Sequence, residues 1–223
     1  MRLSIIVPVL NEAAGIPAAL QALAPLRERG HEVIVVDGGS RDATAALAAP
    51  LCDRLLASPR GRARQMNAGA KTASGEVLLF LHADITLPLH ADALVQNALA
   101  SGALWGRFDV RIAGRSALFP LIARLMNLRS RLTGIATGDQ AMFTSAALFK
   151  QLGGFAELPL MEDIEFSSRL RAAGRPACLR EQVRTSGRRW EQHGVWRTIF
   201  LMWRLRWRYW RGTPAEVLAK AYE

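Results

Sequence analysis

Hydrophobic positions in the first ninety residues fall into two alternating kinds of segment. Four short, mainly apolar runs have the length and composition of buried strands: 3–9, 32–37, 53–58 and 76–84. Three longer stretches between them suit helices, by apolar spacing or alanine content: 13–29, 41–49 and 62–73. Strands that alternate with helices predict an α/β fold whose mainly parallel sheet carries helices on both faces.

The alternation becomes irregular after residue 90. Helices are expected at 89–100, 116–132 and 161–174, a strand or hairpin at 103–114, and a glycine-rich loop at 133–140. No repeat, low-complexity tract or linker divides the chain. We therefore predict one domain over residues 1–223. Its parts are a nucleotide-binding half (1–90), an acceptor-binding and catalytic half (91–193) and a C-terminal amphipathic helix (194–223).

The composition points to an anionic partner inside the cell. The net charge is +10, and all but three of the 29 basic residues are arginine. This balance suits nucleic acid, an anionic membrane surface or a phosphorylated small molecule, although a biased genome composition also produces it. The two cysteines have no paired spacing, and no apolar run is long enough to span a bilayer. We expect a cytoplasmic protein with free thiols, at most peripheral to the inner face of the membrane.

Polar residues follow three of the predicted strands. Asn11 and Glu12 follow the first, Asp37 opens an Asp-Gly-Gly-Ser turn after the second, and Asp84 closes the fourth. Any one of these is more typical of a turn. Because ligands bind beyond the carboxyl ends of parallel strands, the three together predict a binding site at this rim.

Five motifs resemble those of family 2 glycosyltransferases of the GT-A fold, in the family's order and spacing over about residues 3–166: "IIVPVLNE", "VIVVDGGSRDAT", "LLFLHADI", "GGF" and "MEDIEF". The resemblance implies a single Rossmann-like domain and an inverting transfer of sugar from a nucleoside diphosphate sugar, typically of uridine. The chain is also similar to a small bacterial subgroup associated with arsenosugar biosynthesis. The acceptor could equally be another small molecule or a lipid phosphate.

The resemblance places the donor on the first strands. Asp37 would accept a hydrogen bond from the base, because an ionised carboxylate only accepts. Arg60 and Arg64 would contact the phosphates through their planar guanidinium groups, although a solvated helix face explains each equally well. The other donor or substrate contacts that the resemblance implies are Pro8, Asn11, Glu12, Ser40, Asp42 and Asp139.

His82-Ala83-Asp84 stands where the family has an Asp-x-Asp motif. The resemblance implies that Asp84 ligates Mn²⁺ or Mg²⁺, which stabilises the charge on the leaving diphosphate. His82 replaces the first acid. A neutral imidazole can ligate Mn²⁺ or bind a ribose hydroxyl, and a buried structural histidine is an equal alternative.

Glu162 and Asp163 begin a predicted helix, where the helix dipole favours acids. The resemblance assigns the catalytic base to Asp163, with Glu162 beside it; helix capping is the plainer explanation. Arg189 and Trp190 partly resemble the Arg-Trp motif of processive members, which implies a diphosphate contact and stacking on a sugar. The chain lacks the spanning helices of those members, so we do not predict polymerisation.

Residues 194–212 hold four of the six tryptophans. At about 100° per residue, one helix face carries the apolar residues Trp196, Ile199, Phe200, Trp203, Trp207 and Trp210. A stripe beside it carries Arg197, Arg204, Arg208 and Arg211. This pattern predicts either contact with an anionic membrane or a helix that packs on the domain or in a homodimer.

Two other functions fit parts of the sequence. A sugar-phosphate nucleotidyltransferase would need a glycine- and arginine-rich loop after the first strand, where this chain has "LNEAAGIP". A non-enzymatic basic module that binds membrane or RNA explains the charge and the tryptophans. It does not explain the acids at the strand ends, and we do not predict nucleic acid as a partner.

Overall fold

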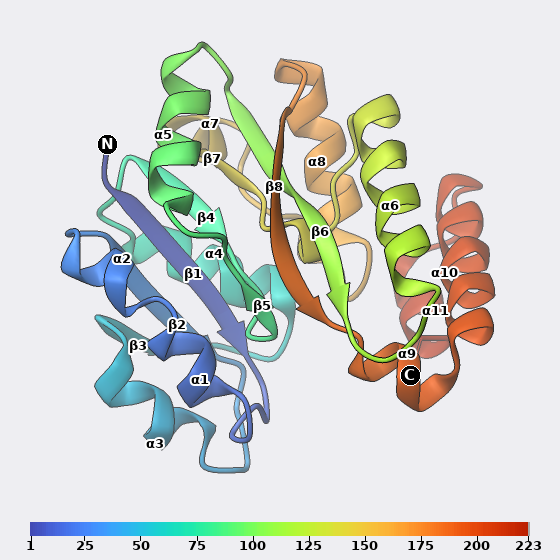
Figure 1. Ribbon diagram of the computed structural model, residues 1–223, viewed down its shortest axis with the longest axis horizontal. Coiled ribbons are helices and arrows are strands. Elements are labelled where there is room, and N and C mark those ends of the chain that lie inside the picture. The colour runs from blue at the N-terminus through green and yellow to red at the C-terminus, as the bar shows by residue number, and fades with distance from the viewer. Residues whose placement is uncertain (223) are drawn as a thin grey trace.

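The computed structural model describes residues 1–222, except for the side chain of Arg189. Within these residues the centre is a mixed sheet of eight strands in the order β3-β2-β1-β4-β7-β6-β8-β5 (Figure 1). The strands are β1 Leu3–Val9, β2 Glu32–Asp37, β3 Arg54–Ala57, β4 Val77–Phe80, β5 Ile85–Thr86, β6 Trp105–Ala113, β7 Phe143–Ser145 and β8 Ala177–Ser186. The fold is therefore α/β with a mostly parallel sheet, as the sequence predicts.

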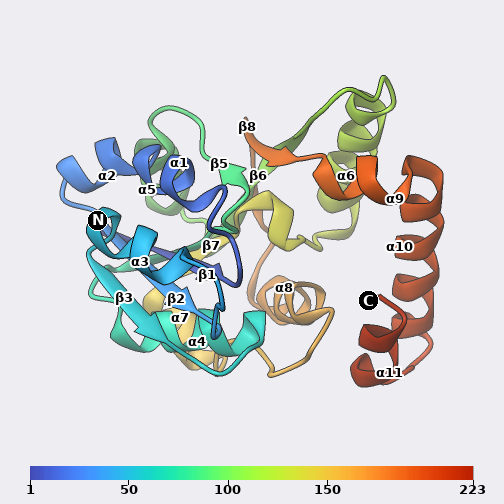
Figure 2. The ribbon, with the colours of Figure 1, turned by 90° about the horizontal axis from the view of Figure 1, so that it is seen from below.

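Helices cover both faces of this sheet (Figure 2). They are α1 Ile16–Gln21, α2 Ala24–Glu28, α3 Thr44–Ala48, α4 Arg62–Thr72, α5 Ala91–Ala100, α6 Phe119–Thr133, α7 Ala146–Gln151, α8 Glu162–Ala173, α9 Arg188–His193, α10 Val195–Trp210 and α11 Ala215–Lys220, with 3₁₀ turns at Ala49–Leu51 and Gly138–Gln140. No helix in the described part of the chain is long and apolar enough to cross a membrane.

Strand β1 has every residue buried, and its side chains alternate between two cores. Ile5 and Val7 join the core beneath α1, α2 and α5, whereas Ile6 joins the core beneath α4, α7 and α8. This two-sided burial is why the strand is apolar without interruption.

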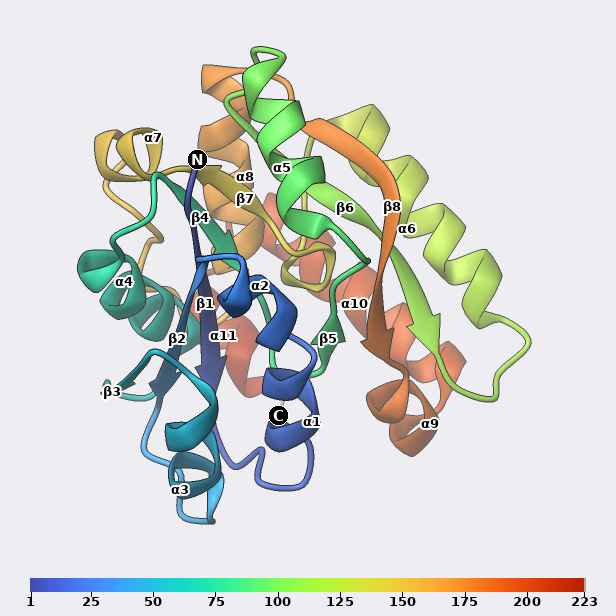
Figure 3. The ribbon, with the colours of Figure 1, turned by 60° about the vertical axis from the view of Figure 1, so that its left-hand side comes forward.

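Strand β7 joins the two halves of the sheet. It pairs antiparallel with β4 on one side and with β6 on the other, so β6 runs in the same direction as β4. Strand β8 then pairs parallel with β6. The arrowheads of β1, β2, β6 and β8 consequently point toward one end of the molecule (Figure 3). Polar residues that follow these strands meet at a single rim.

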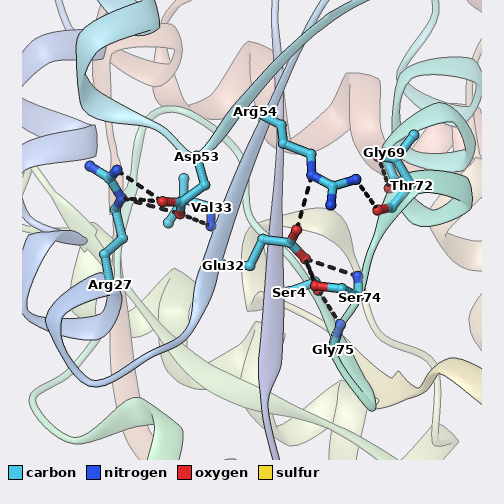
Figure 4. A network of polar contacts seen from close by, with 10 residues as sticks. All are labelled: Ser4, Arg27, Glu32, Val33, Asp53, Arg54, Gly69, Thr72, Ser74 and Gly75. Carbon is cyan, nitrogen blue, oxygen red and sulfur yellow. Dashed lines mark hydrogen bonds and ion pairs between the residues drawn. The ribbon is translucent and has the colours of Figure 1, made fainter.

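The opposite end of the parallel strands is held by a buried carboxylate (Figure 4). Glu32 accepts hydrogen bonds from the Ser4 hydroxyl at 2.6 Å and from the Ser74 amide at 2.9 Å, and it pairs with Arg54 at 3.3 Å. Burial raises the pKa of Glu32, but the hydrogen bonds from Ser4 and Ser74 outweigh it and hold this pKa below its usual range. The clamp fixes the sheet at the end away from the rim.

Four details differ from the sequence-based expectation. The segment 13–29 forms two short helices, because Pro25 cannot continue α1. The predicted strand 76–84 ends at Phe80, so His82 and Asp84 lie in the turn that follows. Strands β5 and β7 and helices α7 and α9 were not expected. Neither was β8, whose sequence "ACLREQVRTS" is mainly polar.

Candidate active site

A cavity of about 180 Å³ opens between the carboxyl rim of the sheet and helix α10. Its walls come from the turn after β4, the start of α4, the 3₁₀ turn after residue 137, the start of α8, the end of β8, and α10. The charged and aromatic residues among its walls are Arg62, His82, Asp84, Asp139, Glu162, Asp163, Trp190, Arg206 and Tyr222. Two acids come from segments far apart in the sequence, Asp84 and Asp163, and the fold brings them to one cavity.

Three carboxyl groups of this cavity have raised pKa values. Burial raises the pKa of Asp139 to about 6, and the nearby charges of Asp84 and Asp163 add to the shift. Burial likewise raises the pKa of Glu162 to about 7, together with the charge of Asp163. Asp84 is more open to solvent, and desolvation still raises its pKa while Arg62 and Arg188 oppose the shift. Burial is the main cause of all three shifts, and neighbouring acids add to those of Asp139 and Glu162.

Arg62 is the cation that faces these acids. It begins helix α4 and lines the cavity. Burial alone would lower the pKa of Arg62. The negative charges of Glu162, Asp139 and Asp163 outweigh this effect, so its pKa is raised overall. The sequence pointed to Arg60 and Arg64 on either side. Arg60 is exposed, and Arg64 pairs with the exposed Glu157 at 3.0 Å. Neither lines the cavity, and their phosphate contacts stay predictions.

Asp163 is held rigidly at the start of α8. One carboxylate oxygen accepts the amide of Gly138 at 2.8 Å, and the other accepts the amide of Ile164 at 2.7 Å. Met161 precedes the helix in the left-handed region, with φ of 69°. The cavity-facing orientation of Asp163 thus depends on the backbone of the loop that also carries Asp139.

His82 packs directly against that same loop. A Cβ added to Gly138 would lie 2.3 Å from Cε1 of His82, so only glycine fits there. Burial, with a contribution from Arg62, lowers the pKa of His82 to about 3. The imidazole is therefore neutral, and it places no second negative charge beside Asp84.

We expect Gly138→Ala to destabilise the protein by about 1–3 kcal/mol, because overpacking must displace either the imidazole or the loop. Denaturant unfolding measures the loss. Gly15→Ala is the matched control, since nothing lies within 4 Å of a Cβ at that glycine. In a double-mutant cycle with His82→Ala, most of the loss should disappear. An equal loss with and without the imidazole would contradict this explanation.

The predicted nucleoside side of the rim is tied together by short contacts. The Asp37 carboxylate accepts the amide of Ser40 at 3.1 Å and the Ser40 hydroxyl. That hydroxyl oxygen accepts the amide of Asn11 at 2.9 Å, and Asn11 adopts a positive φ of 54°. Pro8 is buried within β1, opposite Val36. The structure therefore brings Asp37, Ser40 and Asn11 together and leaves Pro8 inside the sheet.

Glu12 links this group to the cavity. Burial raises the pKa of the Glu12 carboxyl group. Arg188 lowers this pKa, whereas Asp84 raises it. Nη2 of Arg188 lies 3.8 Å from Oε2 of Glu12. Asp42 is exposed and accepts the amides of Ala13 at 3.2 Å and Thr44 at 3.0 Å. Both acids lie between the end of β2 and the turn that carries Asp84.

Two residues that sequence reasoning missed also shape the site. Gln65 donates from Nε2 to the carbonyls of Val9 and Val36, both at 2.8 Å, and so fixes the ends of β1 and β2. Arg206 reaches the cavity from α10. Trp190 lines the cavity as well, whereas the side chain of Arg189 lies outside the described residues. Only the helical phase of α4 and α10 could have indicated Gln65 and Arg206.

The raised pKa of Glu162 predicts a pH-dependent effect of Glu162→Gln. A carboxyl group with a folded pKa of about 7 costs stability as the pH rises from its ordinary value through 7. Glutamine removes this cost. We expect the variant to be more stable than the parent by about 2 kcal/mol near pH 8 and to lose this advantage near pH 5. Urea unfolding at both pH values measures the difference, and a pH-independent difference would contradict the assignment.

The acids at the cavity suit a hard divalent cation that takes only one or two ligands from the protein. Among the described residues, no three of His, Cys, Asp and Glu gather as a ready metal site. Mg²⁺ and Mn²⁺ prefer oxygen ligands and keep several waters, so one or two protein ligands suffice when a diphosphate supplies others. Asp84 is the accessible carboxylate that could hold such an ion, with His82 two residues before it.

Curated proteins with similar sequences include glycosyltransferases. A PGL/p-HBAD biosynthesis glycosyltransferase of Mycobacterium bovis is 42% identical over 106 residues, which cover 44% of this chain and 41% of that protein. The chain thus spans about two fifths of the length of such curated relatives.

Solved structures share the fold at low sequence identity. S. aureus TarS in complex with UDP superposes with a TM-score of 0.66 at 23% identity, over 83% of this chain and 60% of that chain. A mannosyltransferase of Pyrobaculum calidifontis in complex with GDP-Man and Mn²⁺ gives a TM-score of 0.63 at 22% identity, over 82% and 56% of the two chains. Both likenesses agree with the GT-A fold that the sequence motifs imply.

The family match covers the strand ends that form one side of the rim. The model of glycosyl transferase family 2 matches residues 4–149, more than half of the chain. Asp37, Asp84 and Asp139 fall inside the match, and Glu162 and Asp163 lie beyond it. Of the functions that the sequence left open, the match supports the transferase. The chain belongs to glycosyl transferase family 2.

Proposed function

We propose that the protein is an inverting glycosyltransferase that moves a sugar from a nucleoside diphosphate donor, with uracil as the base, to a hydroxyl-bearing acceptor. One observation carries the proposal. Three acids with raised pKa values and Arg62 surround a single cavity at the carboxyl rim of a parallel sheet. This is where open α/β sheets bind their ligands. The nucleotide complexes of the two fold neighbours support a nucleoside diphosphate donor, and the UDP complex of TarS supports uracil as its base.

The donor would lie across the ends of β1, β2 and β4. Asp37 would accept a hydrogen bond from the base, with Ser40 and Asn11 fixing its carboxylate. Arg62 would contact the diphosphate, because among the arginines near residue 60 it is the one that lines the cavity, and its guanidinium suits phosphate oxygens. The donor sugar would then occupy the cavity beside Asp139 and Trp190.

Asp84 would hold a divalent cation, Mn²⁺ or Mg²⁺, with His82 as a second ligand or a ribose contact. Such a cation supplies positive charge to the departing diphosphate. The neutral state of His82 is compatible with either role, since only an unprotonated ring nitrogen can ligate a metal.

Asp163 would take the proton from the acceptor hydroxyl. Its two backbone hydrogen bonds fix the carboxylate, so that little reorganisation is needed when the acceptor arrives. Attack from the face opposite the diphosphate inverts the anomeric configuration. Glu162, with its pKa near 7, would exchange protons readily next to this base.

Calorimetric titration of UDP and of GDP, each with and without Mn²⁺, tests the proposal. We expect UDP to bind at least about tenfold more tightly with Mn²⁺ than without it, because Asp84 would hold the ion and its positive charge would attract the diphosphate. UDP should also bind more tightly than GDP. A folded protein that binds neither nucleotide would refute the glycosyltransferase proposal.

A further inference from the structure

Helix α10 carries an aromatic face that no other described part of the chain covers. Its members are 58% to 79% exposed: Trp196, Phe200, Trp203, Trp207 and Trp210. The opposite side of the helix is buried through Thr198 and Leu205. Ile199 departs from the sequence-based face, because it is half-buried and packs on the core. Helix α10 therefore packs on the domain through its other side, as one of the sequence-based alternatives expects, and leaves this aromatic face exposed.

A second apolar stripe lies on helix α6. Leu121, Leu125, Leu128 and Leu132 follow at intervals of four, three and four residues, which places them on one helix face. All four are at least 51% exposed. Helices α6 and α10 lie at the same end of the molecule in two perpendicular views (Figures 1 and 2). Exposed apolar area of this extent typically marks an interaction surface.

The charge of both helices complements an anionic surface. Neither helix contains an acidic residue, while α6 carries three arginines and α10 carries four. On α10 the arginine stripe runs directly beside the aromatic face: Arg197, Arg204, Arg208 and Arg211. A second copy of the chain would bring equal positive charges together, which opposes a symmetric dimer through this face.

We propose that α10, together with α6, docks on the surface of an anionic lipid bilayer. Tryptophan side chains favour the level of the lipid headgroups, and arginines beside them reach the lipid phosphates. An amphipathic helix with this pattern lies in the plane of the interface and does not cross the membrane.

A hollow beside the aromatic face is a second argument for an anionic lipid as the partner. It has a volume of about 560 Å³, and its walls include His193, Arg197, Phe200, Leu201 and Arg204. Cations and apolar side chains together suit the phosphate and the first methylene groups of an anionic lipid.

The docking surface and the active-site cavity share one helix. Met202, Leu205 and Arg206 line the cavity from α10, while the tryptophans point away from it. Docking would therefore bring the cavity next to the bilayer and make a lipid-borne acceptor accessible. This last step rests on the proposed function; the docking itself does not.

Vesicle co-sedimentation of the whole chain tests the docking. We expect binding to vesicles of phosphatidylglycerol and phosphatidylcholine in equal parts, weak binding to phosphatidylcholine alone, and loss of binding at high salt. Two double variants, Trp203→Ala with Trp207→Ala and Arg204→Glu with Arg208→Glu, should each weaken binding at least about tenfold. Calorimetry should show that both variants still bind UDP as the parent does, which separates this test from that of the proposed function.

Matched controls isolate the surface. Leu89→Ala removes an exposed apolar residue elsewhere, and Arg2→Glu with Lys71→Glu makes the same charge change on the far half. Both should bind vesicles like the parent. Equal binding to both vesicle types, retained binding in the tryptophan variant, or an equal loss in the controls would overturn the proposal. A stable dimer that the tryptophan substitutions dissociate, without vesicle binding, would overturn it in favour of a second copy.

Discussion

Asp84→Asn is expected to lower donor turnover by about two to three orders of magnitude. Asp84 is the accessible carboxylate in the turn after β4, and it lines the cavity together with Arg62. Asparagine keeps the size of the side chain and removes the charge that would hold a divalent cation at the diphosphate. Release of UDP from a UDP-sugar measures turnover without knowledge of the acceptor, because water can replace the acceptor.

The same variant should also separate metal-dependent binding from the rest of the donor contacts. In Asp84→Asn, UDP affinity with Mn²⁺ should fall to the value that the parent shows without Mn²⁺. Glu157→Gln is the control, since this exposed acid pairs only with Arg64 outside the cavity. Full Mn²⁺-dependent tightening of UDP in Asp84→Asn would remove Asp84 from the cation site.

Asp163→Asn is expected to lower turnover by about two to four orders of magnitude while UDP affinity stays unchanged. The amide cannot take a proton from the acceptor. It can still accept one of the two backbone hydrogen bonds, from Gly138 or Ile164, so the start of α8 should keep its structure. Single-turnover kinetics with calorimetry resolves the two quantities.

Glu165→Gln is the matched control for the base. It lies on the same helix, pairs with Arg169 at 2.6 Å and does not line the cavity. Its turnover should match the parent after correction for any loss of folded protein. If Asp163→Asn lowered UDP affinity and turnover to the same extent, Asp163 would be a donor contact and another group would be the base.

The sequence was most informative where burial alone decides structure. Strands β1 and β2 are apolar because both faces are covered, and their bounds match the prediction. Strand β8 has exposed residues through most of its middle and pairs with β6, which lies about seventy residues earlier in the chain. No local sequence pattern indicates pairing with so distant a strand, so β8 could not be predicted from the sequence.

The sequence indicated which acids would line the candidate site, but it did not indicate which arginines would. Asp84 and Asp163 belong to motifs that resemble those of the family, Asp139 was expected as a substrate contact, and the fold brings all three to one cavity. Among the arginines near residue 60, the choice depends on where α4 begins, because neighbouring helix positions face directions about 100° apart. Only the observed start at Arg62 identifies that residue as the one facing the acids.

Helix α10 is also the outer wall of the cavity, and this wall is one helix thick. An α-helix with its side chains is about 10–12 Å across. The wall lies outside the residues that the family model matches, 4–149. Substitutions within this single segment can therefore change the size and chemistry of the cavity while strands β1, β2 and β4 keep their sequence. If the proposed function is right, acceptor range and donor choice are separable properties of this architecture.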